Sequence, residues 1–229
     1  MTAVASVHIA DVGIGRALPL LVRTPKAEGL LHADLGIAAP LGGAGPPRPQ
    51  PGRVGLVAFW EHEDAVERFV AEHQLAARLA HGWRATLEPL RAHGAWPGLS
   101  PEVPPGRATE HDGPAVVVTV ARFRLRRTVP FFRTSSRAER AVVEAPGLLW
   151  ATGLARPPFV ATCSLWESTR ALSTYAYGRR DQRHPDAIAR GEAKPFHVRQ
   201  AFIRFRALRS EGSLGGRNPM TVAHDVHVP

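Results

Sequence analysis

The chain has 229 residues, a formal net charge of +9 and a hydrophobic share of 44%. This length and composition are ordinary for a folded globular protein with one large or two small domains. No run of 18 apolar residues occurs, so no membrane-spanning helix is expected, and the N-terminus lacks the features of a signal peptide. A single cysteine, Cys163, rules out an intramolecular disulfide, and together these features favour the cytoplasm.

Arginine carries nearly all of the positive charge, because Lys26 and Lys194 are the only lysines. A strongly basic chain requires that nucleic-acid binding be considered. The arginines are scattered, however, and no lysine-rich tail or aromatic-interleaved RNA motif accompanies them. We therefore expect no nucleic-acid partner, and the milder alternative is a basic surface that attracts anionic substrates or cofactors.

The first half of the chain predicts the element order β-α-β-β-α-β. β-branched and alternating apolar stretches predict strands at residues 4–12, 30–37, 53–60 and 82–90. Helices are predicted at 15–28, which has Pro19 in its first turn, and at 61–72, which starts with acidic residues. Residues 76–80 extend the second helix or begin a short third one, and the glycine- and proline-rich residues 38–52 predict a loop.

The second half repeats this order after a proline- and glycine-rich stretch. Its predicted strands and helices are strand 115–123, helix 128–145, strand 147–154, strand 158–166, helix 167–177 and strand 196–208. The expected domains are an N-terminal half (1–96), a linker (97–114), a C-terminal half (115–210) and a flexible tail (211–229). We expect the tail to be dispensable for stability, because it is glycine-rich and has little periodic apolar pattern.

The two halves also share residues at matching places. Pro19 matches Pro130 early in the first helix, and Trp60 matches Trp166 at the end of the third strand. The offset between the halves shortens where loop 38–52 is longer than its partner, 155–158, as expected for a duplication with loop variation.

Two β-α-β-β-α-β units are ferredoxin-like, each with helices on one face of an antiparallel sheet. Packing the two uncovered faces together would give an α+β barrel from one chain, a single-chain pseudo-dimer of the dimeric α+β barrel type.

The clearest motifs lie between Pro158 and Leu208. They are a strand ending Ser-Leu-Trp-Glu-Ser (164–168), a helix with Ala-Leu and Tyr-Ala-Tyr (171–177), His-x-x-Ala-Ile (184–188) and a strand ending Arg-Phe-x-x-Leu (204–208). Together with 82–96 and 147–153, they resemble the spheroidene monooxygenase-like family over most of residues 1–208. The resemblance implies a dimeric α+β barrel, a haem cofactor and oxygenation of a hydrophobic substrate, which is a carotenoid in the named member.

Within this resemblance, the segment around His184 is the expected haem site. His184 is the first candidate ligand of the haem iron, and His197 is the second. Three arginines close to it are candidates for holding the haem propionates, namely Arg179, Arg180 and Arg183. Tyr175 and Phe196 could form an apolar wall for the porphyrin. The structural alternatives are a surface histidine that caps a short helix and a solvated basic link.

Other candidates have simpler interpretations. Trp60 and Trp166 are expected to pack in the core of each half, and Cys163 to be a small buried hydrophobe rather than a thiolate ligand. His81 is a minor ligand candidate at the matching link of the first half. His224 and His227 form a His-x-x-His pair in the tail, where a disordered terminus is the expected state.

Arginines on two strands form a further candidate set. Arg204 and Arg206 alternate with apolar residues on the last strand, which should neighbour the strand that carries Arg122 and Arg124. These arginines could line one sheet face and receive an anionic group; solvated strand ends are the alternative.

Three functions remain open at this stage, and the sequence names no catalytic residue. The first is a haem-dependent monooxygenase that acts on a carotenoid-like or other hydrophobic or aromatic metabolite with an electron donor, with a homodimer as one expected assembly. The second is a cofactor-free antibiotic-biosynthesis-type oxygenase or cyclase, and the third is a non-enzymatic ligand-binding barrel. No nucleotide-binding, zinc-ribbon or serine-hydrolase motif is found.

Overall fold

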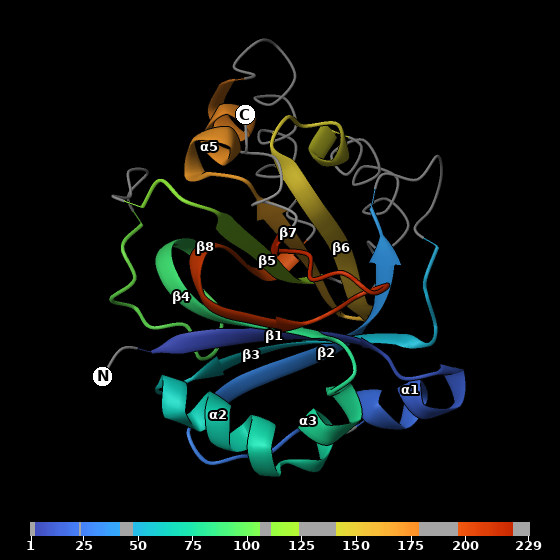
Figure 1. Ribbon diagram of the computed structural model, residues 1–229. Helices are drawn as coiled ribbons and strands as arrows, with labels where there is room; N and C mark the ends of the chain where they lie inside the picture. Colours follow the sequence, from blue (N-terminus) through green and yellow to red (C-terminus); the bar gives the residue numbers. More distant parts are fainter. Residues whose placement is uncertain are drawn as a thin grey trace.

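Eight antiparallel strands close into a barrel in the computed structural model of the protein (Figure 1). The structure describes residues 3–22, 24–41, 48–105, 111–123, 141–178 and 197–221. The strands are β1 (Val4–Asp11), β2 (Leu30–Pro40), β3 (Arg53–Trp60), β4 (Trp83–Gly94), β5 (Ala115–Phe123), β6 (Leu148–Arg156), β7 (Phe159–Trp166) and β8 (His197–Gly212). Their order around the barrel is β1-β3-β2-β6-β7-β5-β8-β4. The predicted mixed α+β class with a barrel is therefore confirmed.

The two halves of the chain contribute equivalent arcs to this barrel. The first half contributes the order β4-β1-β3-β2 and the second the order β8-β5-β7-β6, so the strand order is the same in both. The β2–β6 and β4–β8 pairings join the arcs edge to edge. Closure satisfies the backbone hydrogen bonds that each arc alone would leave open at its edges.

Helices cover the barrel from two sides (Figure 1). On one side lie α1 (Ile14–Leu21), α2 (Glu63–Glu72) and α3 (Gln74–Leu79), and α5 (Thr169–Gly178) lies on the other. Two histidines cap the second and third helices: the backbone N–H of Ala65 donates to Nδ1 of His62, and that of Leu75 donates to Nδ1 of His73. No helix in the described part of the chain is long and apolar enough to cross a membrane.

Several predicted boundaries shift. The first helix ends at Leu21 rather than at residue 28, β2 runs to Pro40 and β4 continues past Pro89 to Gly94. The proline is tolerated because the β4–β8 register shifts between Pro89 and Arg91, where the ladder is irregular. The predicted helix 128–145 lies mostly outside the described residues, although residues 141–143 are helical.

Buried side chains separate into the barrel interior and the layers between sheet and helices. The interior cluster draws apolar residues from β1 to β8, and a second cluster packs β1–β3 against α1–α3. Trp60 and Trp166 lie in the helix-side layers, and each indole N–H donates to a serine hydroxyl, on Ser6 and Ser164 respectively. Both tryptophans are therefore core residues, as the sequence predicts.

The end of the chain packs on the barrel, unlike the expected tail from residue 211. Strand β8 runs to Gly212, and Leu214 and Met220 pack against the barrel interior cluster. The indole N–H of Trp83 donates to the Ser210 hydroxyl, which in turn donates to Asn218 Oδ1. Residues 211–221 thus belong to the fold, and 222–229 lie outside the described residues.

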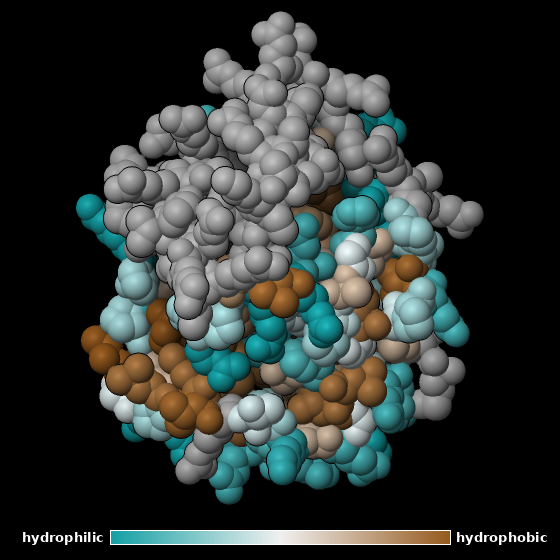
Figure 2. Space-filling model, turned by 180° about the vertical axis from the view of Figure 1, so that it is seen from behind, coloured by the Kyte–Doolittle hydropathy of each residue, from teal (hydrophilic) through white to brown (hydrophobic). Residues whose placement is uncertain are grey.

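Helix α1 exposes apolar side chains along its outer side. Ile14 and Leu18 of the helix and the C-cap residue Val22 are 64%, 66% and 83% exposed, whereas Ala17 and Leu20 are buried against the sheet. Figure 2 shows this hydrophobic strip at the edge of the molecule where α1 lies. The outward half of the helix is therefore apolar surface rather than core.

Candidate functional site

The predicted haem site lies mainly outside the described residues. This applies to the first ligand candidate, to the porphyrin-wall candidate Phe196 and to the basic link, that is to Arg179, Arg180, Arg183 and His184. The same is true of His224 and His227 in the tail. The assignments of these residues stay predictions. No group of three or more histidine, cysteine or acidic side chains in the described ranges could hold a metal ion.

Two residues of the predicted haem site, Tyr175 and His197, lie within the described part of the chain. Tyr175 is on α5, half-buried, with its ring centroid 5.1 Å from that of Trp166. His197 begins β8, opposite Phe123 of β5. Helix α5 therefore packs on the C-terminal arc of the barrel, of which β8 is itself a strand, and the sequence predicts the haem site beside this helix.

Two minor ligand candidates have no ligand-like setting. Cys163 is fully buried in the barrel interior, and this burial raises the pKa of its thiol to about 12. The thiol is therefore protonated at neutral pH, which confirms the interpretation of a small buried hydrophobe. His81 is an exposed residue in the turn before β4.

The expectation that the strand arginines line one face is wrong. Strand β8 does neighbour β5, but Arg204 pairs with Val117, whereas Arg122 pairs with Arg199. Because side chains alternate along a strand, Arg204 lies on the outer face and Arg122 on the inner face of the barrel wall. Arg204 is buried and donates to the Ser173 hydroxyl of α5, and Arg124 lies outside the described residues.

The outer faces of the two arcs differ in what fills them. In the N-terminal arc, Leu56 pairs with Leu35 on one side and with His8 on the other. Leu56 lies four residues before Trp60, and Thr162 lies four residues before Trp166, so the two are equivalent in the repeat. Thr162 pairs with Gly153 on one side and with Thr119 on the other. A rung of two leucines and a histidine therefore corresponds to a rung of two threonines and a glycine.

Burial follows this difference in side-chain size. The N-terminal rung is almost fully covered by α1–α3, with Leu56 at 0%, Leu35 at 1% and His8 at 3% exposure. Thr119, Gly153 and Thr162 are all partly exposed. At this rung the outer face of the C-terminal arc thus has small side chains on β5, β6 and β7, with Phe202 of β8 beside Thr119, whereas the N-terminal rung is close-packed.

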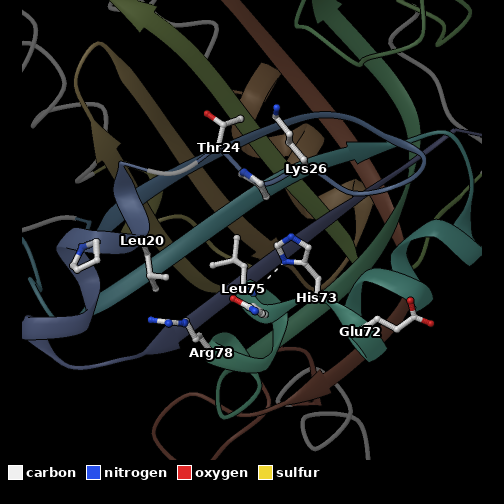
Figure 3. Close-up of a pocket in the computed structure, with 10 residues that line it drawn as sticks. Leu20, Thr24, Lys26, Glu72, His73, Leu75 and Arg78 are labelled. Carbon is white, nitrogen blue, oxygen red and sulfur yellow. Dashed lines mark hydrogen bonds between the residues drawn. The ribbon is translucent and has the colours of Figure 1, made fainter.

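The helix layer of the N-terminal half contains a pocket, called the hollow below (Figure 3). It has a volume of about 580 Å³ and lies between the end of α1, the following loop and the α2–α3 junction. Leu20 and Leu75 form its apolar wall, while Thr24, Lys26, Glu72, His73 and Arg78 give it a polar rim. In the repeat that aligns Trp60 with Trp166, helix α2 (Glu63–Glu72) corresponds to α5 (Thr169–Gly178), with the same offset of 106 residues.

A charged cluster lies at one end of the barrel and was missed by the sequence analysis. The carboxylate of Asp34, which is 2% exposed, accepts from His32 Nε2 at 2.7 Å and from Trp96 Nε1 at 3.3 Å. Arg122 donates to its other oxygen at 3.0 Å, and a guanidinium nitrogen of Arg156 lies 3.8 Å from the same oxygen. The signal that could have revealed it is an acidic residue in an apolar strand at an inward-facing position.

Two curated proteins are similar to the chain over about three quarters of its length. A spheroidene monooxygenase from Rubrivivax gelatinosus is 31% identical over 176 residues, which cover 74% of this chain and 66% of the relative. A spheroidene monooxygenase from Rhodobacter capsulatus is 27% identical over 72% of this chain and 70% of its own length. These matches confirm the resemblance to a spheroidene monooxygenase-like family. The chain spans about two thirds of the length of these relatives, and no protein-family model matches it.

The fold is also shared with a solved structure. An aldoxime dehydratase in complex with butyraldoxime superposes with a TM-score of 0.51 at 9% identity, over 90% of this chain and 79% of its own. At this identity, the likeness shows a common barrel architecture.

Proposed function

We propose that the protein is a haem-dependent monooxygenase that oxidises a hydrophobic, carotenoid-like or other secondary metabolite. The observation that carries the proposal is the contrast between the two arcs. Thr119, Gly153 and Thr162 leave the outer face of the C-terminal arc small and partly exposed, where the N-terminal arc is filled by His8, Leu35 and Leu56. A flat group such as a porphyrin needs a face of this kind, and the two similar proteins are both named as monooxygenases.

The internal repeat supports the same location. We infer that the chain is a tandem pair of ferredoxin-like units with the boundaries 1–96 and 115–210, joined by residues 97–114. In the first unit, His73 and Arg78 line the hollow beside α1 (Figure 3). Helix α2, which ends at this hollow, corresponds to α5 in the second unit, and the predicted ligand and propionate residues follow α5 in the sequence.

The proposed roles follow from the chemistry of the side chains. His184 would bind the iron through a neutral imidazole nitrogen, with His197 as the second candidate. The arginines at 179, 180 and 183 would pair with the two propionates, since guanidinium groups bind carboxylates in a bidentate way. Tyr175 and Phe196 would contact the porphyrin. The bound haem would supply activation of dioxygen, with electrons from a separate donor.

Haem loading of the purified protein tests the proposal. A Soret band at near-stoichiometric haem, after expression or after addition of hemin, is the expected result. The His184→Ala variant should lose or shift this band, while His197→Ala and His81→Ala should keep it, with circular dichroism confirming that each variant is folded. A folded protein that takes up no hemin would contradict the haem proposal and favour a cofactor-free oxygenase.

A second experiment tests the face itself. Thr162→Leu places at the C-terminal rung the residue that the N-terminal rung has, and it should reduce hemin binding by filling the face at this rung. Thr86→Leu is the matched control, because Thr86 is a half-buried strand residue on the outer face of the other arc, paired with Ser6. Equal hemin affinity in the two variants would show that the cofactor does not use this face.

A further inference from the structure

Three arginines lie along one rung of the barrel wall, at the end of the barrel that contains Asp34. Arg199 of β8 pairs directly with Arg122 of β5, which pairs with Phe159 of β7, which pairs with Arg156 of β6. Residues paired across antiparallel strands project to the same face, with Cβ atoms roughly 5 Å apart. The buried Phe159 belongs to the barrel interior cluster, so this rung faces inward, close to the ends of β5, β6 and β7.

A single buried carboxylate holds two of the three arginines in place. Arg122 and Arg156 both approach Oδ1 of Asp34. Arg156 also donates to the backbone carbonyl of Leu21 at 2.7 Å, and the Arg122 guanidinium lies 5.7 Å from the ring centroid of the buried Trp96. These contacts fix the two guanidinium groups, although 38% of the Arg122 side chain and 32% of the Arg156 side chain remain exposed.

The charges at this end of the barrel do not balance among the described residues. Arg199 is exposed and forms no ion pair with any residue that the structure describes. Asp34 is the carboxylate that the other two arginines share. Like charges directly opposite on paired strands destabilise a sheet unless something lies between them. Three guanidinium groups around one carboxylate leave a net charge of +2, and His32 beside Asp34 adds no negative charge.

We propose that Arg122, Arg156 and Arg199 form a binding site for a dianionic oxyanion group, either a phosphate or a dicarboxylate. Guanidinium groups recognise such oxygens through paired N–H donors. Asp34 positions Arg122 and Arg156, and Arg199 supplies a charge that no described residue neutralises. The site lies on the inner face of the barrel wall and is separate from the outer face proposed for haem.

Isothermal titration with inorganic phosphate and with succinate tests the site, with acetate and sodium chloride at matched ionic strength as controls. Saturable binding of at least one dianion is expected, and the one that binds identifies the ligand as phosphate-like or dicarboxylate-like. Arg199→Gln should weaken this binding by about tenfold or more, because a charge-assisted contact is removed. The variant should fold, since Arg199 is exposed and has no described ion pair to lose.

The matched control is Arg170→Gln, which removes the same charge from α5, where the side chain is 82% exposed. It should leave dianion binding unchanged. The proposal is overturned if neither dianion binds beyond the effect of ionic strength, or if both arginine variants weaken binding equally. Displacement of the bound dianion by hemin would also overturn it, because the group would then share the haem site.

Discussion

His8 should make the protein sensitive to mild acid. It lies on β1 under α2, its ring 5.8 Å from that of Phe69, and its Nε2 is 3.2 Å from the Ser6 hydroxyl. Burial, with a smaller contribution from Arg84, lowers the pKa of this histidine from 6.5 to about 3. The folded state therefore keeps His8 neutral at a pH where the unfolded chain protonates it.

The sign and size of the effect follow from this pKa. Between about pH 6.5 and pH 3, the unfolded state binds one more proton at His8 than the folded state, so stability is lost as the pH falls. At pH 5, the loss is about 2 kcal/mol, since each unit below 6.5 contributes about 1.4 kcal/mol. For a chain of this size, that corresponds to a fall in melting temperature of roughly 4–8 °C.

The assay compares melting temperatures at pH 7 and pH 5 in wild type, His8→Leu and His81→Gln. His8→Leu has similar bulk and does not titrate, and the Ser6 hydroxyl still accepts from Trp60 in this variant. Between pH 7 and pH 5, the melting temperature of His8→Leu should fall by roughly 4–8 °C less than that of wild type, whatever the stability of the variant at pH 7. The exposed His81 serves as the control and should behave as wild type. An unchanged fall in His8→Leu would refute the reasoning.

Three further outcomes are expected. Truncation after Leu208 should lower the melting temperature by more than about 5 °C, because it removes β4–β8 pairs and the hydroxyl that accepts from the buried Trp83 indole N–H. Loss of that acceptor alone costs about 1–3 kcal/mol. Truncation after Thr221 should leave the melting temperature unchanged, and equal values for the two truncations would show that residues 209–221 do not stabilise the barrel. Cys163 should resist thiol reagents at pH 8 until denaturant is added, since burial raises its thiol pKa to about 12; modification of the native protein would contradict this. Asp34→Asn should lower the unfolding free energy by about 2 kcal/mol, less than for a fully buried pair because the arginines are partly exposed, and a denaturant midpoint equal to that of wild type would show that the cluster is not coupled to folding.

Local patterns in the sequence were sufficient for most of the elements. The strands 53–60 and 115–123 have the predicted bounds, because β-branched apolar runs between loop residues leave few alternatives. The shared position of Trp60 and Trp166 predicted equivalent halves, and the strand order is the same in both. These features depend on residues that are close in sequence, so no knowledge of the packing was needed.

Tertiary structure alone decided which side chains meet. Asp34, Arg122 and Arg156 come from three different strands, and they converge because β2 pairs with β6 where the two arcs join. Alternation along β8 shows that Arg204 and Arg206 share a face, but only the pairing of Arg204 with Val117 shows that this face is not the one that carries Arg122. A shift of one residue in register moves every side chain to the opposite face of a sheet. Register is set by the closure of the whole barrel, so the charged end of the barrel could not be predicted from the sequence.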